Sequence, residues 1–333
     1  MEFIMALIED NNVENILEIG VYNGVNSIAM MKSGLEKNKN FQLYSIDLGT
    51  DENIFGKAAI DTFSNYEREH YHLYLGKTVF NLEEIIPNKI KFDLIFIDAG
   101  HSYPLALVDL IYSIPYLNTD GIILLHDIID YDDFAWGESY IFEAWSSEKY
   151  RIYDYYKGCF SNMGCILLHK DKELLYDNIK FISKMPFMAN PWIINKYNNN
   201  KIEQYTIEHI ESFGIGMELK DLNNMELFMN KYYDTFFVRD IINIFKSNFE
   251  DYKNNALERI HMSRFFHTIH NDRINIYNRL INLETHFENY IHITKSQESN
   301  NLEYKFNKLI DQIAWWIPLK KWRDNFRNKI LNS

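Results

Sequence analysis

Two segments near the middle of the chain combine acidic residues with histidines. Asp98 and His101 follow the apolar run FDLIFI, and His126 and Asp127 follow the apolar run GIILL. If these runs are neighbouring parallel strands, their polar ends meet at the edge where open α/β sheets bind ligands. Two carboxylates there could share one cation, Mg²⁺ or Mn²⁺, and a histidine could accept a proton. Asp98 and Asp127 are therefore candidate metal ligands, with His101 as first and His126 as second candidate base.

These residues also have structural alternatives. Asp98 could cap the following helix or hydrogen-bond a ligand amine, and His126 could be a core histidine paired with Asp127. A bound cation would need further ligands, which the sequence offers in His126, Asp130, Asp132 and Asp133. The residues alone leave a metal-assisted and a metal-free site open.

A glycine turn precedes this region. The segment NILEIGVYNG, residues 15–24, predicts a buried strand, a sharp turn at Gly20 and Gly24, and a helix start with free N–H groups. Asp47 ends the next strand and could accept hydrogen bonds from both hydroxyls of a ribose. The pattern predicts a nucleoside cofactor. It disfavours a nicotinamide dehydrogenase, because Tyr22 stands where the dinucleotide fingerprint has its second glycine.

The spacing E-x-G-x-x-x-G, beginning at Glu18, resembles motif I of the class I S-adenosylmethionine-dependent methyltransferases. The segments around His101 and His126 resemble a subfamily with the patterns I-D-G-D-H-S-Y and H-D. This subfamily includes sugar and antibiotic O-methyltransferases and cephalosporin hydroxylase-like proteins. The resemblance covers about residues 1–170 and departs at Gly100, where the pattern has a second acid, and at Pro104. It implies S-adenosylmethionine as the cofactor, bound by Glu18, Gly20, Tyr22, Gly24, Asp47 and Asp98.

The first half of the chain alternates between strand-like and helix-like segments, as parallel α/β sheets do. Strands are predicted at residues 15–20, 41–47, 72–75, 92–98, 121–126, 151–156 and 163–169, with helices such as 24–37 and 104–117 between them. Too few residues join the last two strands for a helical crossover, so these should be antiparallel. We expect a Rossmann-like seven-stranded class I methyltransferase sheet with an antiparallel last strand, followed by a mostly α-helical C-terminal region.

Composition narrows the classes of function. The 333 residues are 47% apolar, enough for a large core, and the net charge of −13 argues against a general nucleic-acid binder. The two cysteines, Cys159 and Cys165, lack metal-ligand spacing and predict a reducing compartment. Neither a signal peptide nor an apolar run of the roughly 20 residues that span a membrane is expected. The protein is predicted to be cytoplasmic.

The sequence changes character beyond about residue 186. We predict a methyltransferase domain at residues 1–186, a helical region at 187–313 and a basic amphipathic tail at 314–333. Apolar residues from Ile276 to Ile313 recur at steps of three and four, which fits a bundle or a coiled coil that forms a homo-oligomer. The tail carries five cations and one acid, which fits either peripheral contact with anionic lipid on the inner face of the cytoplasmic membrane or a helix docked on the protein's own acidic surface or on a partner subunit.

The acidic and aromatic loop at residues 128–140 is typical of a carbohydrate site or of an ordinary solvated loop. We therefore expect O-methylation of a sugar hydroxyl in surface polysaccharide biosynthesis. Two alternatives stay open: an inactive cofactor-binding scaffold of a glycan-assembly complex, and a hydroxylase-like enzyme on the same fold.

Overall fold

The computed structural model describes residues 2–87, 90–128, 137–154, 159–187, 217 and 219–255. The chain divides into two compact units, Met1–Asn275 and Ile276–Ser333. All described residues belong to the first unit, so the apolar repeats beyond Ile276 and the basic tail lie outside the described residues.

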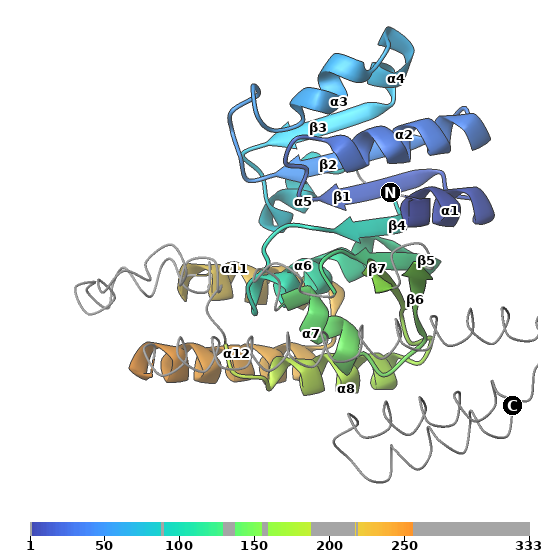
Figure 1. The fold of residues 1–333 in the computed structure, drawn as a ribbon. Helices are drawn as coiled ribbons and strands as arrows, with labels where there is room; N and C mark the ends of the chain where they lie inside the picture. Colours follow the sequence, from blue (N-terminus) through green and yellow to red (C-terminus); the bar gives the residue numbers. More distant parts are fainter. Residues whose placement is uncertain are drawn as a thin grey trace, which may run out of the picture. The chain divides into compact units, whose positions relative to one another are not determined.

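Seven strands form one sheet in the order β3-β2-β1-β4-β5-β7-β6 (Figure 1). They are β1 (Asn15–Ile19), β2 (Gln42–Asp47), β3 (Tyr71–Leu75), β4 (Phe92–Ile97), β5 (Leu117–Leu125), β6 (Lys149–Asp154) and β7 (Cys159–Leu167). The first five pair in parallel, and β7 is antiparallel to both β5 and β6. The predicted class I methyltransferase sheet with its antiparallel last strand is confirmed.

Helices cover both faces of the sheet. The helices are α1 (Glu2–Asp10), α2 (Val25–Lys37), α3 (Lys57–Thr62), α4 (Asn65–Glu69), α5 (Leu82–Ile85), α6 (Leu105–Ser113), α7 (Gly137–Ala144), α8 (Lys172–Ser183), α11 (Leu219–Tyr232) and α12 (Thr235–Asn254). Residues of α1, α2 and α3 share one apolar core with one face of the sheet. Residues of α6, α7, α8, α11 and α12 share a larger core with the other face. Alternate residues of β1 enter the two cores, as the strand period requires.

The connection between β4 and β5 differs from the predicted helix at residues 104–117. The α-helix α6 ends at Ser113 and is followed by a 3-10 turn, η2 (Ile114–Tyr116), that contains Pro115. A proline clashes with the preceding helical turn, which explains the early end. β5 then begins at Leu117, four residues before the predicted strand, and its pairing with β4 has an irregularity between Phe92 and Leu94.

The helices beyond residue 186 are part of the first unit's core. Phe228 of α11 and Phe237 and Phe245 of α12 are buried in the same cluster as residues of β4 and β5. α12 also packs against α8 (Figure 1). The predicted helical character is confirmed for α11, residues 219–232, and α12, residues 235–254. Within the described ranges, no helix has the length and apolar character needed to cross a bilayer.

The order of strands reverses between β1 and β4. From β1 the sheet continues to β2 and β3 on one side, and from β4 it continues to β5, β7 and β6 on the other. In open α/β sheets, the crevice beyond the carboxyl ends of two such strands is where ligands bind. The predicted glycine turn and the first polar segment both lie at this edge, because Gly20 follows β1 and Asp98 follows β4.

Candidate active site

The turn after β1 depends on glycine at position 20. Gly20 has a φ of +92°, and a Cβ added there would lie 1.9 Å from the backbone oxygen of Asp98. Any side chain would therefore push apart the ends of β1 and β4. Gly24, with a φ of +88°, is the N-cap of α2. Tyr22, between them, also has a left-handed backbone, with a φ of 47°, which is uncommon for a residue other than glycine.

Asp47 holds this turn from the end of β2. Its Oδ2 accepts hydrogen bonds from the backbone N–H groups of Val21, at 2.8 Å, and Tyr22, at 2.9 Å. Its Oδ1 accepts one from the N–H of Gly49 at 2.7 Å. These three bonds offset the unfavourable backbone at Tyr22 and keep the carboxylate at the rim of the crevice.

Glu18 lies beneath the turn, with a fully buried side chain. Its Oε2 accepts hydrogen bonds from the hydroxyls of Ser27 in α2 and Ser45 in β2, both at 2.6 Å, while Oε1 has no partner. Burial raises the pKa of Glu18 to about 7, although the two serines oppose this shift. The residue ties β1, β2 and α2 together below the crevice.

A cavity of about 540 Å³ opens at this edge of the sheet. Gly20, Tyr22, Asp47, Asp98 and His101 line it among the predicted site residues. Leu48, Phe80 and Asp109 line it as well, but Glu18, Gly24, His126 and Asp127 do not. The cavity therefore connects the glycine turn with the first of the two polar clusters.

Four side chains from the ends of β4 and β5 lie close together beside the cavity. His126 Nδ1 is 2.9 Å from Asp127 Oδ1 and 3.1 Å from Asp98 Oδ1. His101 Nδ1 is 3.6 Å from Asp127 Oδ2. Asn162 donates a hydrogen bond of 2.6 Å to Asp127 Oδ1. The structure thus brings the segment with Asp98 and His101 next to the segment with His126 and Asp127, as predicted.

Asp98, His101 and Asp127 offer three donor atoms within 4.8 Å of one another. Two carboxylate oxygens and an imidazole nitrogen suit a divalent cation such as Mn²⁺ or Mg²⁺. Asp127 also has a left-handed backbone, with a φ of 51°. Such strained residues persist where the surrounding structure fixes them, often at functional sites. The predicted additional ligands Asp130, Asp132 and Asp133 lie outside the described residues.

Glu138, in the first turn of α7, is a site residue that the sequence did not reveal. Its side chain is fully buried, Oε1 is 3.3 Å from His101 Nδ1, and Oε2 has no partner. Burial disfavours the charged form of His101, but Glu138, Asp127 and Asp98 outweigh this effect and raise its pKa to about 9. For His126, burial is likewise outweighed by Asp127 and Asp98, which raise the pKa to about 10. The histidines balance the charge of the surrounding carboxylates.

Asp109 is a second buried acid near this cluster. It lies in α6, accepts a hydrogen bond from the backbone of Gly100, and has its pKa raised to about 8 by burial. It therefore fixes the loop that carries Asp98 and His101. The sequence offered a signal, because Asp109 interrupts the otherwise apolar run LALVDLIY.

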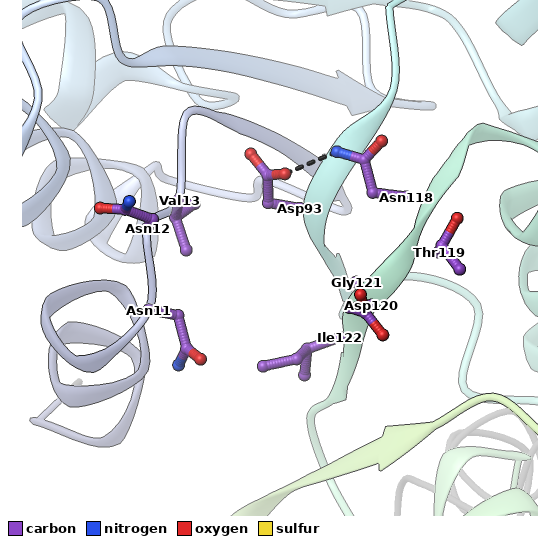
Figure 2. A pocket seen from close by; sticks show the side chains of 9 residues that line it. All are labelled: Asn11, Asn12, Val13, Asp93, Asn118, Thr119, Asp120, Gly121 and Ile122. Carbon is purple, nitrogen blue, oxygen red and sulfur yellow. Dashed lines mark hydrogen bonds between the residues drawn. The ribbon is translucent and has the colours of Figure 1, made fainter.

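A second pocket, of about 410 Å³, lies at the amino ends of the parallel strands β1 and β4 (Figure 2). Its acid Asp93 accepts hydrogen bonds from the backbone N–H groups of Glu14 and Asn15 and from Asn118 Nδ2. Figure 2 shows the last of these bonds, between Asp93 and Asn118. The carboxylate of Asp93 thus joins β4 to the start of β1 and to β5. The histidine–carboxylate cluster is found only at the first cavity among the described residues.

Residues 17–128 match a family model described as a methyltransferase domain. This segment is a methyltransferase domain. It includes the predicted cofactor-binding residues, both candidate bases and the two candidate metal ligands Asp98 and Asp127, but not the possible additional ligands Asp130, Asp132 and Asp133. Glu138, α7, α8, α11 and α12 follow the matched methyltransferase segment in the chain.

Several solved methyltransferase structures resemble the chain. The O-methyltransferase TomG from Streptomyces achromogenes, involved in tomaymycin synthesis and solved with S-adenosylmethionine, is 14% identical, with a TM-score of 0.39. The match covers 49% of this chain and 77% of TomG. An O-methyltransferase from Bacillus cereus, solved with S-adenosylhomocysteine, is 16% identical, with a TM-score of 0.36, over 49% of this chain and 78% of the other.

A putative O-methyltransferase from Klebsiella pneumoniae is 17% identical, with a TM-score of 0.38, over 49% of this chain and 77% of the other. No curated protein matches the chain. The assignment of the methyltransferase domain accordingly rests on the family match together with the observed sheet, and not on the similarity to individual structures.

Proposed function

We propose that the protein transfers a methyl group from S-adenosylmethionine to an acceptor oxygen at the carboxyl ends of β1 and β4. The observation that supports this most directly is one cavity lined by the glycine turn, Asp47, Asp98 and His101. The turn would hold the methionine half of the cofactor, and Asp47 the ribose. Residues 77–80, on the same cavity, would lie along the adenine. Glu18 and Gly24 would contribute by shaping the turn.

His101 is the proposed general base. It lines the cavity, and Glu138 Oε1 lies 3.3 Å from its Nδ1, which leaves Nε2 as the nitrogen for the acceptor. A base whose other nitrogen is held by a carboxylate keeps a fixed ring orientation and tautomer. Since methyl transfer also needs the acceptor oxygen in line with the sulfonium methyl, the position of the base matters as much as its basicity. His126 is the second candidate.

Asp98 and Asp127 are the proposed ligands of a divalent cation, Mg²⁺ or Mn²⁺. The two carboxylates fit such an ion, although Gly100 removes the second acid of the related pattern. A bound cation would orient the acceptor oxygen, lower its pKa and offset the negative charge that raises the pKa of His101. Methyl transfer that is lost with a chelator and restored by Mg²⁺ or Mn²⁺ would support the ion, and unchanged transfer would contradict it.

The proposed acceptor is a sugar hydroxyl of a surface polysaccharide or its precursor. The support is chemical: carboxylates near the cluster can accept hydroxyl hydrogen bonds, and residues 128–140 add acids and aromatic rings. The basic tail at 314–333 would bring the enzyme to the inner face of the cytoplasmic membrane, and the helical region could form a homo-oligomer. These proposals rest on sequence patterns.

Two measurements test this function. Calorimetric titration with S-adenosylmethionine and with NAD should give binding of the first alone. Mass spectrometry of surface glycans from cells with and without the protein should give a difference of one methylene group. Binding without any methylated product would favour the inactive scaffold, and an oxygenated product without S-adenosylhomocysteine would favour a hydroxylase-like reaction.

A further inference from the structure

One wall of the cavity is formed by the loop after β3. Lys77, Thr78, Val79 and Phe80 line the cavity, and the last two belong to the short 3-10 helix η1 (Val79–Asn81). This loop is supported from behind by α5 and α6. The loop, α5 and α6 all lie within the segment that matches the methyltransferase domain.

A row of aromatic rings connects this wall to α11, which lies outside the matched segment. Phe80 meets Tyr112 of α6 edge to face, with ring centres 5.1 Å apart. Tyr112 stacks on Phe228 of α11, at 4.0 Å and an interplanar angle of 14°. Tyr112 and Phe228 are both buried, whereas Phe80 reaches the cavity. The position of Phe80 therefore depends on a ring supplied by α11.

Polar contacts join the same parts of the protein. On α5, Glu83 accepts hydrogen bonds from Lys231 Nζ at 2.6 Å and from the Tyr232 hydroxyl at 3.0 Å. The adjacent Glu84 accepts a bond of 3.0 Å from Lys77 Nζ in the cavity wall. α5 is thus held by α11 on one side and holds the cavity wall on the other. These contacts are partly exposed, so the buried rings provide most of the connection.

We propose that α11 sets the position of the cavity wall at residues 77–80 and thereby the affinity for the cofactor, with Phe228 and Tyr112 as positioning residues. The inference rests on the proposed binding of a nucleoside cofactor in this cavity. It gives α11 a defined role beyond contributing to the core, because a shift of one ring at Phe228 is transmitted through Tyr112 to a residue that lines the site.

The test is calorimetric titration of Phe228→Leu with S-adenosylhomocysteine, well below the unfolding temperature. Leucine keeps apolar volume but removes the stacked ring, so the Kd should rise about threefold to tenfold. The KM for S-adenosylmethionine should rise in parallel while kcat at saturation stays unchanged. Leu227→Ala is the matched control, since Leu227 is the neighbouring residue and its side chain is 66% exposed, compared with 4% for Phe228.

A double variant, Lys231→Ala with Tyr232→Phe, removes both contacts to Glu83 from the surface and leaves the buried rings in place. Hydrogen exchange of residues 77–85 should become faster in this variant and in Phe228→Leu, but not in Leu227→Ala. Unchanged Kd and exchange in both variants would overturn the role of α11. Failure of the wild-type protein to bind S-adenosylhomocysteine would instead contradict the proposed function on which this inference rests.

Discussion

At the scale of single residues, the site depends on a few positions where one side chain has no substitute. Gly20 is fixed by a close approach: its φ of +92° and the 1.9 Å separation of an added Cβ from the Asp98 oxygen exclude every other residue. Glu18 is fixed by two serine hydroxyls in a fully buried environment. Both residues act on the geometry of the turn before any ligand is bound.

Gly20→Ala should lower stability and abolish cofactor binding, because it combines backbone strain with displacement of β4. Gly76→Ala is the matched control: Gly76 has a φ of +66°, but its added Cβ would meet only Thr50, at 3.2 Å. The control should therefore lose only about 1 to 2 kcal/mol of unfolding free energy from backbone strain. Denaturant unfolding and titration with S-adenosylhomocysteine measure both effects, and equal losses in the two variants would contradict the close-approach explanation.

Glu18 should make stability depend on pH. Its pKa is about 7 in the folded protein and ordinarily 4.5, so the unfolded chain releases this proton at lower pH than the folded one. The stabilising contribution is full below pH 4.5 and is lost as the pH rises to about 7. Glu18→Gln keeps an acceptor for the two serines and should flatten the change in unfolding temperature over that window. The exposed control Glu143→Gln should leave the pH dependence as in the wild-type protein.

At the scale of elements, the ends of three segments assemble the reacting groups. β4 supplies Asp98 and His101, β5 supplies His126 and Asp127, and the first turn of α7 supplies Glu138. The strand ends could be predicted because parallel strands bring their carboxyl ends to one edge. Glu138 could not, because a helix that packs behind a loop leaves no periodic or spacing signal in the sequence.

Glu138→Ala should lower kcat about tenfold to 100-fold, with little change in the KM for S-adenosylmethionine, because His101 loses the group that orients it. Glu138→Gln can still accept a hydrogen bond from Nδ1 and should recover part of the rate. Glu143→Ala, on the same helix but with a side chain 47% exposed, is the control. Equal kcat values in Glu138→Ala and Glu143→Ala would show that Glu138 does not position the base.

The element boundaries show where local sequence stops being informative. The strands β1, β2, β3 and β4 were predicted within one residue at each end. The start of β5 was missed because the predicted helix ran to Leu117, past Pro115, and the polar residues 118–120 do not have the apolar character of a buried strand. Similarly, the contact between Tyr112 and Phe228 joins residues far apart in sequence, and single-chain periodicity carries no information about such pairs.

At the scale of the whole molecule, the matched methyltransferase domain occupies only part of the chain. The compact unit Met1–Asn275 adds α8, α11 and α12 to it, and these helices complete the core on one face of the sheet. The charge is also unevenly distributed along the sequence: the chain carries −13 overall, yet residues 320–329 hold five cations and one acid. We therefore propose that catalysis depends on the first unit and that membrane contact depends on the basic tail at residues 314–333.

A chain ending at Asn275 should keep the Kd for S-adenosylhomocysteine of the full chain, because the described core lies entirely within the first unit. It should lose binding to vesicles of anionic lipid, to which each cation near the surface contributes about 1 kcal/mol. Cosedimentation with anionic and with neutral vesicles measures this. If the shortened chain binds anionic vesicles as well as the full chain does, the proposed role of the tail is wrong.

The reaction proposed for this protein is methyl transfer at the cluster formed by the ends of β4 and β5. It is tested most directly by measuring S-adenosylhomocysteine released when the purified protein is given labelled S-adenosylmethionine and a fractionated glycan acceptor. With the wild-type protein, we expect labelled acceptor and stoichiometric S-adenosylhomocysteine. Asp127→Asn should lose both while cofactor binding persists, because Asp127 does not line the cavity. Equal transfer by this variant, or no transfer by the wild-type protein to any acceptor, would overturn the proposed reaction.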